Sequence, residues 1–308
     1  MTPNNNRSLP PVCIYEGSDY QDTFWRGGGR AYEDAAEAIA LKRLLPPGGR
    51  LLLELGAGAG RNTPRYHGFE RIVLVDFSTT QLQQAQEHLG VSDRYVYVAA
   101  DIYRLPLVDS LFDSATMIRT LHHMADAPAA LGEVQRVLQK DAAFVLEFAN
   151  KQNLKAILRY LLRRQEWNPF SPQPVEFTRL NFDFHPRTVF NWLEEAGFLV
   201  EKKRTVSHFR LNVLKRLIPA RILAWLDGVL QPTGALWQLS PSVFLRARNL
   251  RQERKSTAKF DEVLSYFKCP ECGHTPLNSG KNRLSCSKCK RGWPVTNGIH
   301  DFRVGSQA

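Results

Sequence analysis

The chain of 308 residues has no uninterrupted run of eighteen or more apolar residues, the length that a membrane-spanning helix needs. Its amino terminus also lacks the apolar core of a signal peptide. Internal repeats and long low-complexity segments are absent as well. We therefore expect an intracellular, cytoplasmic protein, whose length and apolar content of 43% allow one large domain and a small appendage.

Cysteine is scarce and unevenly placed. Cys13 stands alone, and the other four form two C-x2-C pairs separated by 13 residues: Cys269, Cys272, Cys286 and Cys289. Two-residue gaps let each pair form a tight turn whose thiolates converge on one tetrahedral ion. A cytoplasmic setting disfavours the disulfide alternative, and an iron–sulfur cluster is the other option. We expect one structural zinc ion, on which so small a module would depend for folding, while residues 1 to 250 would fold without it.

The most informative pattern is a glycine-rich loop between two apolar segments. Residues 51–61 read LLLELGAGAGR and residues 72–78 read IVLVDFS, which predicts a strand, a loop, a helix and a second strand ending in an acid. Gly56, Gly58 and Gly60 would let the backbone approach a ligand closely. Asp76 stands 20 residues after Gly56, where a carboxylate accepts hydrogen bonds from both hydroxyls of a ribose.

The details of this loop favour one kind of nucleoside. The glycines run G-x-G-x-G, and Arg61 stands where a dinucleotide-binding loop has its last glycine. An acid, Glu54, also precedes the loop. A cationic amino-acid nucleoside suits this arrangement better than a pyrophosphate, and S-adenosylmethionine is the natural candidate.

Two further segments extend the predicted site. Asp101 and Ile102 follow a third apolar strand, where they would bind and pack against an adenine ring. Arg119 follows a fourth strand, placed either to bind the carboxylate of the cofactor or to pair with Glu54 or Asp76. Ligands bind at the carboxyl ends of strands in open α/β sheets. The predicted cofactor-binding residues are Glu54, Gly56, Ala57, Gly58, Gly60, Asp76, Phe77, Ser78, Asp101, Ile102 and Arg119.

These four blocks, in this order and spacing, resemble the class I S-adenosylmethionine-dependent methyltransferases, particularly the branch with quinone-biosynthesis and small-molecule enzymes. The resemblance covers roughly residues 48 to 205. It implies a Rossmann-like, doubly wound α/β fold with a mostly parallel, seven-stranded sheet, and in-line methyl transfer to an acceptor O, N or C atom. For a hydroxyl acceptor, His122, His123 and His185 are the candidate bases, although the first two would equally settle into backbone hydrogen bonds.

The sequence after the second cysteine pair carries another resemblance. Residues 292–302, GWPVTNGIHDF, resemble the tail of the small zinc-ribbon proteins that activate tRNA, rRNA and protein methyltransferases, except that His300 replaces their usual proline. In those systems the ribbon is a separate subunit that lends a strand and an apolar patch to its enzyme. The resemblance implies a zinc ribbon fused to its enzyme in one chain.

The predicted organisation has four parts. Residues 1–47 form a capping segment, whose aromatic residues Tyr15, Tyr20 and Trp25, hinged on the glycines at 27–29, would close over the cofactor. The alternative is a helix at residues 31–45 that simply packs on the sheet. Thr63 and Pro64 mark the helix expected after the glycine loop. The remaining parts are a methyltransferase domain at residues 48–250 with insertions at about 151–183 and 208–241, a linker at 251–265 and a ribbon at 266–308.

Charge divides the chain into two halves. Residues 1–150 carry 14 basic and 18 acidic side chains, whereas residues 151–308 carry 27 and 12. In the insertions, basic residues alternate with apolar ones such as Leu154, Leu158, Ile222 and Trp225, which we expect to roof the substrate mouth. The basic half fits an RNA-binding face, peripheral contact with anionic lipid, or a solvated surface around a small substrate.

A small or lipophilic acceptor is favoured over RNA, because no RNA-binding motif accompanies the charge. The alternative from a different functional class is a non-catalytic protein that binds the cofactor and whose ribbon serves assembly.

Overall fold

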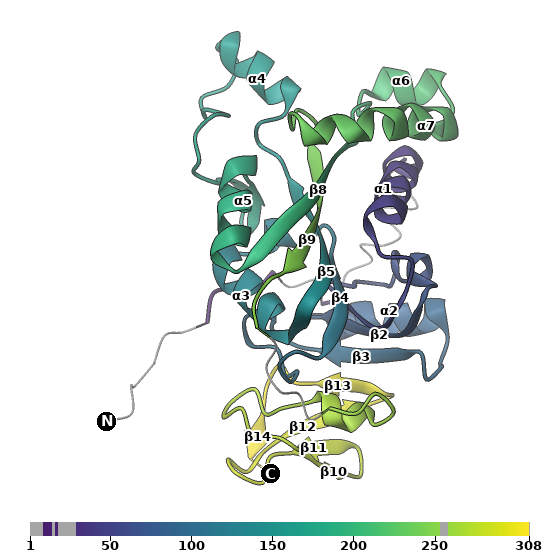
Figure 1. Ribbon diagram of the computed structural model, residues 1–308, viewed down its shortest axis with the longest axis vertical. Helices are drawn as coiled ribbons and strands as arrows, with labels where there is room; N and C mark the ends of the chain where they lie inside the picture. Colours follow the sequence, from purple (N-terminus) through teal and green to yellow (C-terminus); the bar gives the residue numbers. More distant parts are fainter. Residues whose placement is uncertain (1–8, 14–15, 18–28, 253–257, 308) are drawn as a thin grey trace.

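The computed structural model describes residues 9–13, 16–17, 29–252 and 258–307. A twelve-stranded sheet runs through them in the order β10-β11-β12-β13-β3-β2-β1-β4-β5-β9-β8, with β14 paired to β12 (Figure 1). Among the described residues, no helix is both long and apolar enough to cross a bilayer. The aromatic residues Tyr15, Tyr20 and Trp25 lie outside the described residues.

Seven of these strands form the predicted α/β core in the order β3-β2-β1-β4-β5-β9-β8. All pair in parallel except β9, which is antiparallel to both of its neighbours. The fold class is therefore confirmed. The strands are β1 Gly49–Leu55, β2 Phe69–Asp76, β3 Tyr95–Ala99, β4 Phe112–Met117, β5 Leu138–Ala149, β8 Phe198–Val206 and β9 Ser242–Asn249.

Helices cover both faces of this sheet, as the near-continuous apolar strands require. Alternate residues of β1 point to opposite faces, so Leu53 packs with α3 (Ala127–Val137) and α5 (Pro186–Glu195). Leu52 packs instead with α2 (Thr79–Leu89). The predicted amino-terminal helix, α1 (Ala31–Leu44), packs on the same face as α2, against β5, β8 and β9.

The chain returns from β1 to β2 without the α-helix that we predicted. Thr63–Tyr66 (η2) forms only a short 3-10 turn. Eight residues, 61–68, separate Gly60 from Phe69. As an α-helix they would span about 12 Å, whereas the strand beside them is about 23 Å long. The prediction of a full helix was wrong because this connection is too short for a helix to travel back along the sheet.

Both insertions leave the same edge of the sheet. The first contains α4 (Leu154–Leu161) and a hairpin of β6 (Val175–Thr178) and β7 (Asn181–Asp183). The second contains α6 (Asn212–Leu217) and α7 (Ala220–Leu230). Ser242 pairs with both Ala149 and Val206, the last residues of β5 and β8. The insertions therefore depart from the carboxyl ends of parallel strands, at the end of the molecule opposite the ribbon (Figure 1).

The carboxyl-terminal ribbon continues the large sheet. Its strands are β10 Asn278–Gly280, β11 Arg283–Ser285, β12 Arg291–Thr296, β13 Ile299–Asp301 and β14 Ser306–Gln307. β13 pairs in parallel with β3, with Ile299 opposite Tyr97 and Asp301 opposite Ala99. Trp293 and Phe302 are buried in the same hydrophobic cluster as the strands of the core. The ribbon thus adds a strand to the sheet of the larger domain within the same chain, as predicted.

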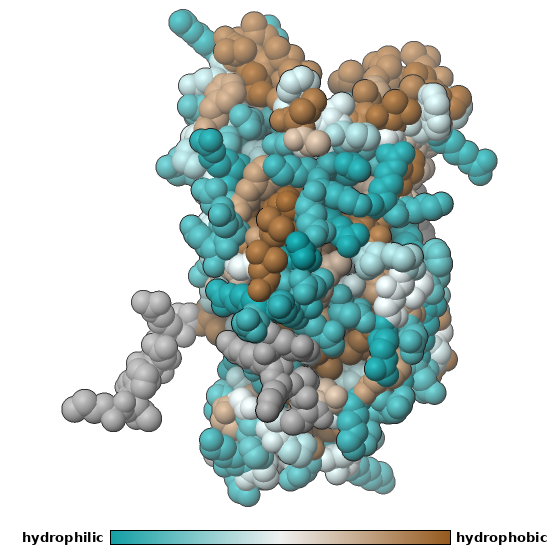
Figure 2. Space-filling model, in the orientation of Figure 1, coloured by the Kyte–Doolittle hydropathy of each residue, from teal (hydrophilic) through white to brown (hydrophobic). Residues whose placement is uncertain are grey.

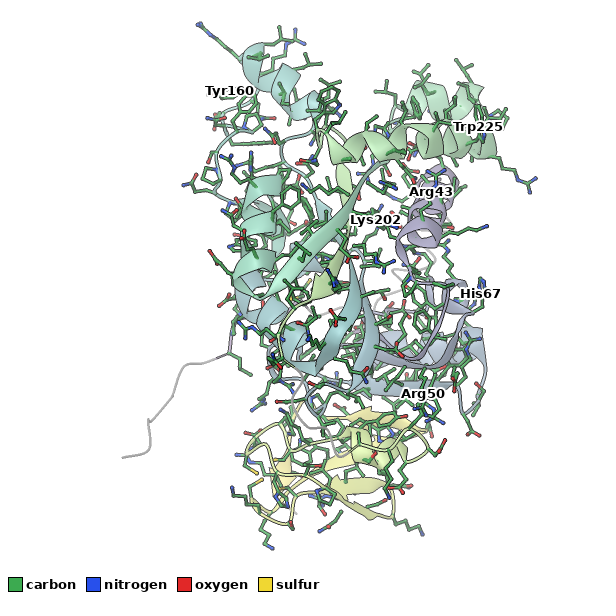
Figure 3. All side chains as sticks on the ribbon, viewed as in Figure 1. Arg43, Arg50, His67, Tyr160, Lys202 and Trp225 are labelled. Carbon is green, nitrogen blue, oxygen red and sulfur yellow. The ribbon has the colours of Figure 1, made fainter. Side chains whose placement is uncertain are left out.

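The segment before the ribbon is also anchored to the core. The guanidinium groups of Arg50 and Arg71 lie over the ring of Phe260, 4.5 and 4.7 Å from its centroid. The backbone N–H of Val108 donates to the carbonyl of Tyr266 over 2.9 Å. Figure 3 shows Arg50 at this junction. The described part of the predicted linker therefore packs against the sheet, which argues against a ribbon that folds and unfolds independently.

Candidate functional site

A pocket opens at the carboxyl ends of β1, β2 and β4, with an empty volume of about 1100 Å³ including its mouth. The predicted residues that line it are Glu54, Gly56, Ala57, Gly58, Asp76, Phe77, Ile102, Arg119 and His123. Gly60, Ser78, Asp101, His122 and His185 do not line the pocket as the described residues form it. The structure thus brings together residues from all four blocks, which lie far apart in the sequence.

Asp76 ends β2 on the wall of this pocket. Its Oδ2 accepts a hydrogen bond from the backbone N–H of Gly58 over 2.8 Å, and its Oδ1 accepts one from Ser78 over 2.9 Å. Burial raises the pKa of this carboxyl group, and the backbone hydrogen bonds oppose that shift. Each carboxylate oxygen has a second lone pair. Asp76 can therefore hold the loop and still accept hydrogen bonds from a diol.

The three loop glycines have different reasons to be glycine. A Cβ at Gly56 would collide with the side chain of Thr120, and one at Gly60 would lie 2.9 Å from Leu89 Cδ1. At Gly58, where φ is +53°, a Cβ would meet only Gln81 Oε1 at 3.7 Å. Gly56 and Gly60 therefore permit close packing, whereas Gly58 leaves open space on the wall of the pocket.

Glu54 is a buried carboxyl group beside the loop. It accepts a hydrogen bond from the hydroxyl of Thr63 over 2.6 Å. Burial raises the pKa of Glu54 to about 7, although this hydrogen bond opposes the shift. Near neutral pH the group is therefore shared between its neutral and ionised forms, and a nearby cation would favour the ionised form.

Arg119 pairs with an acid that we did not predict. Its Nε donates to Oε1 of Glu37 over 2.7 Å, and Arg61 donates to Oε2 of the same carboxylate over 2.9 Å. Burial favours the neutral form of Glu37, but Arg119 and Arg61 hold its pKa below the ordinary value. Neither Glu54 nor Asp76 is the partner of Arg119. No sequence pattern connects Glu37, on α1, with the end of β4.

Of the three candidate bases, only His123 lies at the pocket. Its Nδ1 is 2.9 Å from the carbonyl oxygen of Leu180. A carbonyl can only accept, so Nδ1 carries the hydrogen and the lone pair of the neutral ring lies on Nε2. Burial lowers the pKa of His123, which keeps the imidazole neutral at pH 7. His122 is half-buried beside it, with the two ring centroids 4.1 Å apart, and His185 caps α5 by accepting from Arg187 N–H.

Two other predicted residues have local roles. Asp101 accepts from the backbone N–H of Tyr103 over 2.9 Å and so begins a 3-10 turn. The hydroxyl of Ser78 accepts from the N–H of Gln81 and caps α2. Sequence reasoning also missed several lining residues that carry no motif, namely Val12, Asn62, Tyr66, Thr116 and Met124.

The apolar residues expected to roof the site lie elsewhere. Leu154, Leu158, Ile222 and Trp225 each have at least half of their surface exposed, and none lines the described pocket. That prediction was wrong because α4 and α7 bury only one narrow side, and these side chains lie on the other.

The ribbon reaches the loop that follows Asp76. Arg303 donates to the carbonyl oxygen of Phe77 over 3.1 Å and pairs with Glu16 over 3.0 Å. Burial opposes ionisation of Glu16, but hydrogen bonds from Thr80 and Thr79 lower its pKa to about 2. One arginine of the ribbon therefore joins a pocket-lining residue to the start of α2.

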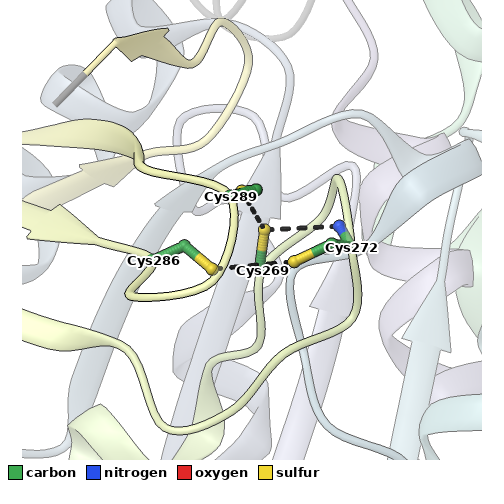
Figure 4. A group of neighbouring side chains, drawn as sticks. All are labelled: Cys269, Cys272, Cys286 and Cys289. Atoms are coloured by element: carbon green, nitrogen blue, oxygen red, sulfur yellow. Dashed lines mark hydrogen bonds between the residues drawn. The ribbon is translucent and has the colours of Figure 1, made fainter.

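The four paired cysteines form a second candidate site (Figure 4). Their sulfur atoms all lie within 4.8 Å of one another, with 3.5 Å between Cys269 and Cys289 and 3.6 Å between Cys272 and Cys286. A tetrahedral zinc–thiolate site has sulfur–sulfur edges of about 3.8 Å. The donor set and its spacing therefore fit one such ion.

Comparisons with known proteins agree with this geometry. Residues 53–146 match a family model described as a methyltransferase domain. A demethylmenaquinone methyltransferase of Chlamydia pneumoniae is 28% identical over 173 residues, which are 51% of this chain and 74% of that protein. The chain is thus an enzyme, an S-adenosylmethionine-dependent methyltransferase.

Solved structures share the fold. A chain in the complex between the Haloferax volcanii Trm112 methyltransferase activator and a methyltransferase has a TM-score of 0.53 and 16% identity, covering 78% of this chain and 100% of its own. An S-adenosylmethionine-dependent methyltransferase from Listeria monocytogenes has a TM-score of 0.50 and 17% identity, covering 71% of this chain and 99% of its own.

Replacement of Asp76 by Ala should weaken binding of S-adenosylmethionine by about 10- to 100-fold, because hydrogen bonds to a charged acceptor contribute about 1.5–3 kcal/mol each. Titration calorimetry measures this affinity. The exposed Asp93→Ala is the matched control and should bind normally. Unchanged affinity in a folded Asp76→Ala protein would show that this carboxylate does not hold the ribose.

Binding of the cationic cofactor should release protons from Glu54. Because the pKa of Glu54 is about 7, affinity should rise with pH between 5.5 and 7 and then level off, by up to about tenfold per pH unit. Calorimetry in buffers with different ionisation enthalpies measures the released protons. Glu54→Gln should abolish this dependence and the exposed Glu70→Gln should retain it. The same pH dependence in Glu54→Gln would contradict the assignment.

Proposed function

We propose that this enzyme methylates a small, lipophilic acceptor of the quinone type. The observation that carries the proposal is the pocket itself, where the carboxylate of Asp76 and the open space at Gly58 lie beside largely apolar walls. The relatives with detectable sequence similarity include demethylmenaquinone methyltransferases, whose name describes a quinone-type substrate.

The pocket offers contacts for the ribose, the adenine and the cationic part of the cofactor. Bound S-adenosylmethionine supplies an electrophilic methyl group on its sulfonium. Asp76 accepts hydrogen bonds from the ribose hydroxyls, and Ile102 packs against the adenine. Glu54 lies beside the glycine loop, where its negative charge favours a cation. Arg119, whose side chain pairs with Glu37, lines the pocket just after the end of β4.

The acceptor side of the pocket favours an apolar molecule. Ile118, Met124 and Val12 line the pocket, next to polar side chains that include Thr120 and His123. Aligning the acceptor atom behind the methyl group in such a cleft supplies most of the rate. If the acceptor is a hydroxyl, Nε2 of His123 takes its proton.

Labelled methyl groups identify the acceptor class directly. Incubation with methyl-labelled S-adenosylmethionine and a cell extract, followed by separation into lipid, RNA and water-soluble fractions, should place the label in lipid. With a hydroxyl acceptor, His123→Gln should lower kcat by about 100-fold or more while cofactor affinity is unchanged. The exposed His67→Gln is its control (Figure 3). Label recovered in RNA would overturn the proposed acceptor.

The rate should also depend on pH in a defined direction. Because burial lowers the pKa of His123, the neutral base persists below the ordinary imidazole pKa of about 6.5. With a hydroxyl acceptor and saturating cofactor, kcat should therefore fall only when the pH drops below that value.

We also propose that Cys269, Cys272, Cys286 and Cys289 hold one structural Zn²⁺. Elemental analysis should find one zinc per chain, and none in Cys286→Ser, whereas Cys13→Ser should retain it. Because β13 belongs to the large sheet, loss of the ion should lower the stability of the whole chain by several kcal/mol. Calorimetry should show one shifted transition. A ribbon that melts separately, or protein without zinc, would contradict this.

A further inference from the structure

Two helical tips carry a large share of the exposed apolar surface of the described chain. We define tip one as residues 154–170 and tip two as residues 211–239. Leu161 and Leu162 in tip one are 66% and 63% exposed, and Leu217 and Trp225 in tip two are 76% and 65% exposed. The buried sides of these helices, such as Ala156 and Leu223, already face the protein. The exposed residues therefore do not hold the fold together.

Both tips lie at one end of the molecule. Figure 2 shows an apolar cap over α4 and another over α6 and α7, at the end opposite the ribbon. Figure 3 places Tyr160 and Trp225 in these caps. The same carboxyl edge of the sheet gives rise to both tips and to the pocket. A flat partner that touched both tips would therefore face the side of the sheet on which the site opens.

Positive charge surrounds these apolar side chains. Tip one contains four basic side chains and one acidic one, the exposed Glu166, and tip two contains three basic side chains and one acidic one, the buried Asp227. Lys155 and Arg159 in tip one are exposed, and so are Arg216 and Arg221 in tip two. Lys215 is engaged differently, because it pairs with Glu33 on α1 over 2.9 Å. Each tip thus offers exposed aliphatic and aromatic groups next to exposed cations.

This combination selects one kind of partner. RNA would engage the cations but would leave exposed leucines in water. An anionic bilayer accommodates both, since apolar side chains enter the boundary between headgroups and acyl chains while lysine and arginine meet lipid phosphates. Tryptophan and tyrosine are enriched at that boundary.

We propose that the two helical tips dock this enzyme on the surface of an anionic lipid bilayer. The inference deepens the proposed function, because a membrane is where a lipophilic acceptor resides. The docking inference rests on the surface of the tips, and its test uses neither cofactor nor methyl transfer. The docking and the proposed acceptor can therefore fail independently.

Sedimentation with vesicles tests the docking. The full-length protein should pellet with vesicles of phosphatidylcholine and phosphatidylglycerol, less so at high salt, and weakly with phosphatidylcholine alone. Leu161→Glu with Leu162→Glu, or Trp225→Glu, should weaken binding by roughly tenfold or more. Val91→Glu is the matched control, because Val91 is 95% exposed between α2 and β3, outside both tips. It adds the same single charge as Trp225→Glu and should bind normally.

Several results would overturn the docking. They are failure to pellet with anionic vesicles, equal pelleting with both vesicle types, or an equal loss in Val91→Glu, which would show an effect of net charge alone. A stable dimer that Trp225→Glu dissociates would assign the tips to a second copy of the chain. RNA binding weakened by Arg216→Gln, without vesicle binding, would assign them to RNA. Methyl transfer to lipid without vesicle binding would leave the proposed function standing and remove only this inference.

Discussion

The outer edge of β3 is the constraint on which the arrangement of this molecule depends. An edge strand presents unpaired backbone groups, and here β13 of the ribbon satisfies them in parallel pairing. That pairing sets Phe302 against the core and carries Arg303 to the carbonyl of Phe77. The cysteine site, the sheet and the cofactor loop are thus parts of one hydrogen-bonded and packed unit.

Two buried acids near the pocket show how partners decide the state of a carboxyl group. Glu37 has two arginines within hydrogen-bonding distance and stays ionised despite its burial. Glu54 has the hydroxyl of Thr63, and burial raises its pKa to about 7. The ionised acid therefore fixes Arg119 and Arg61, while the other one remains responsive to a bound cation.

Much of the fold and part of the site could be predicted from the sequence. Asp76 and Gly58 were found because a strand, a tight turn and an acid at a fixed spacing are local features, read within a short window. The paired cysteines were found for the same reason. The helix predicted after the loop was wrong because the length of the connection was not considered. The glycine loop and Thr63–Pro64 are typical of a helix start, but only eight residues are available before β2 begins.

The sequence by itself determined the fold class, the glycine loop, the acid at the end of β2 and the cysteine pairs. Backbone hydrogen bonding and side-chain periodicity act between near neighbours, so a short stretch of sequence is enough to recognise these features. Only the tertiary structure decided that Arg119 pairs with Glu37, 82 residues away, and that His123 rather than His122 faces the pocket. It also decided that Trp225 is exposed. These outcomes depend on how distant segments pack together, and an amphipathic helix does not specify what will cover its outer side.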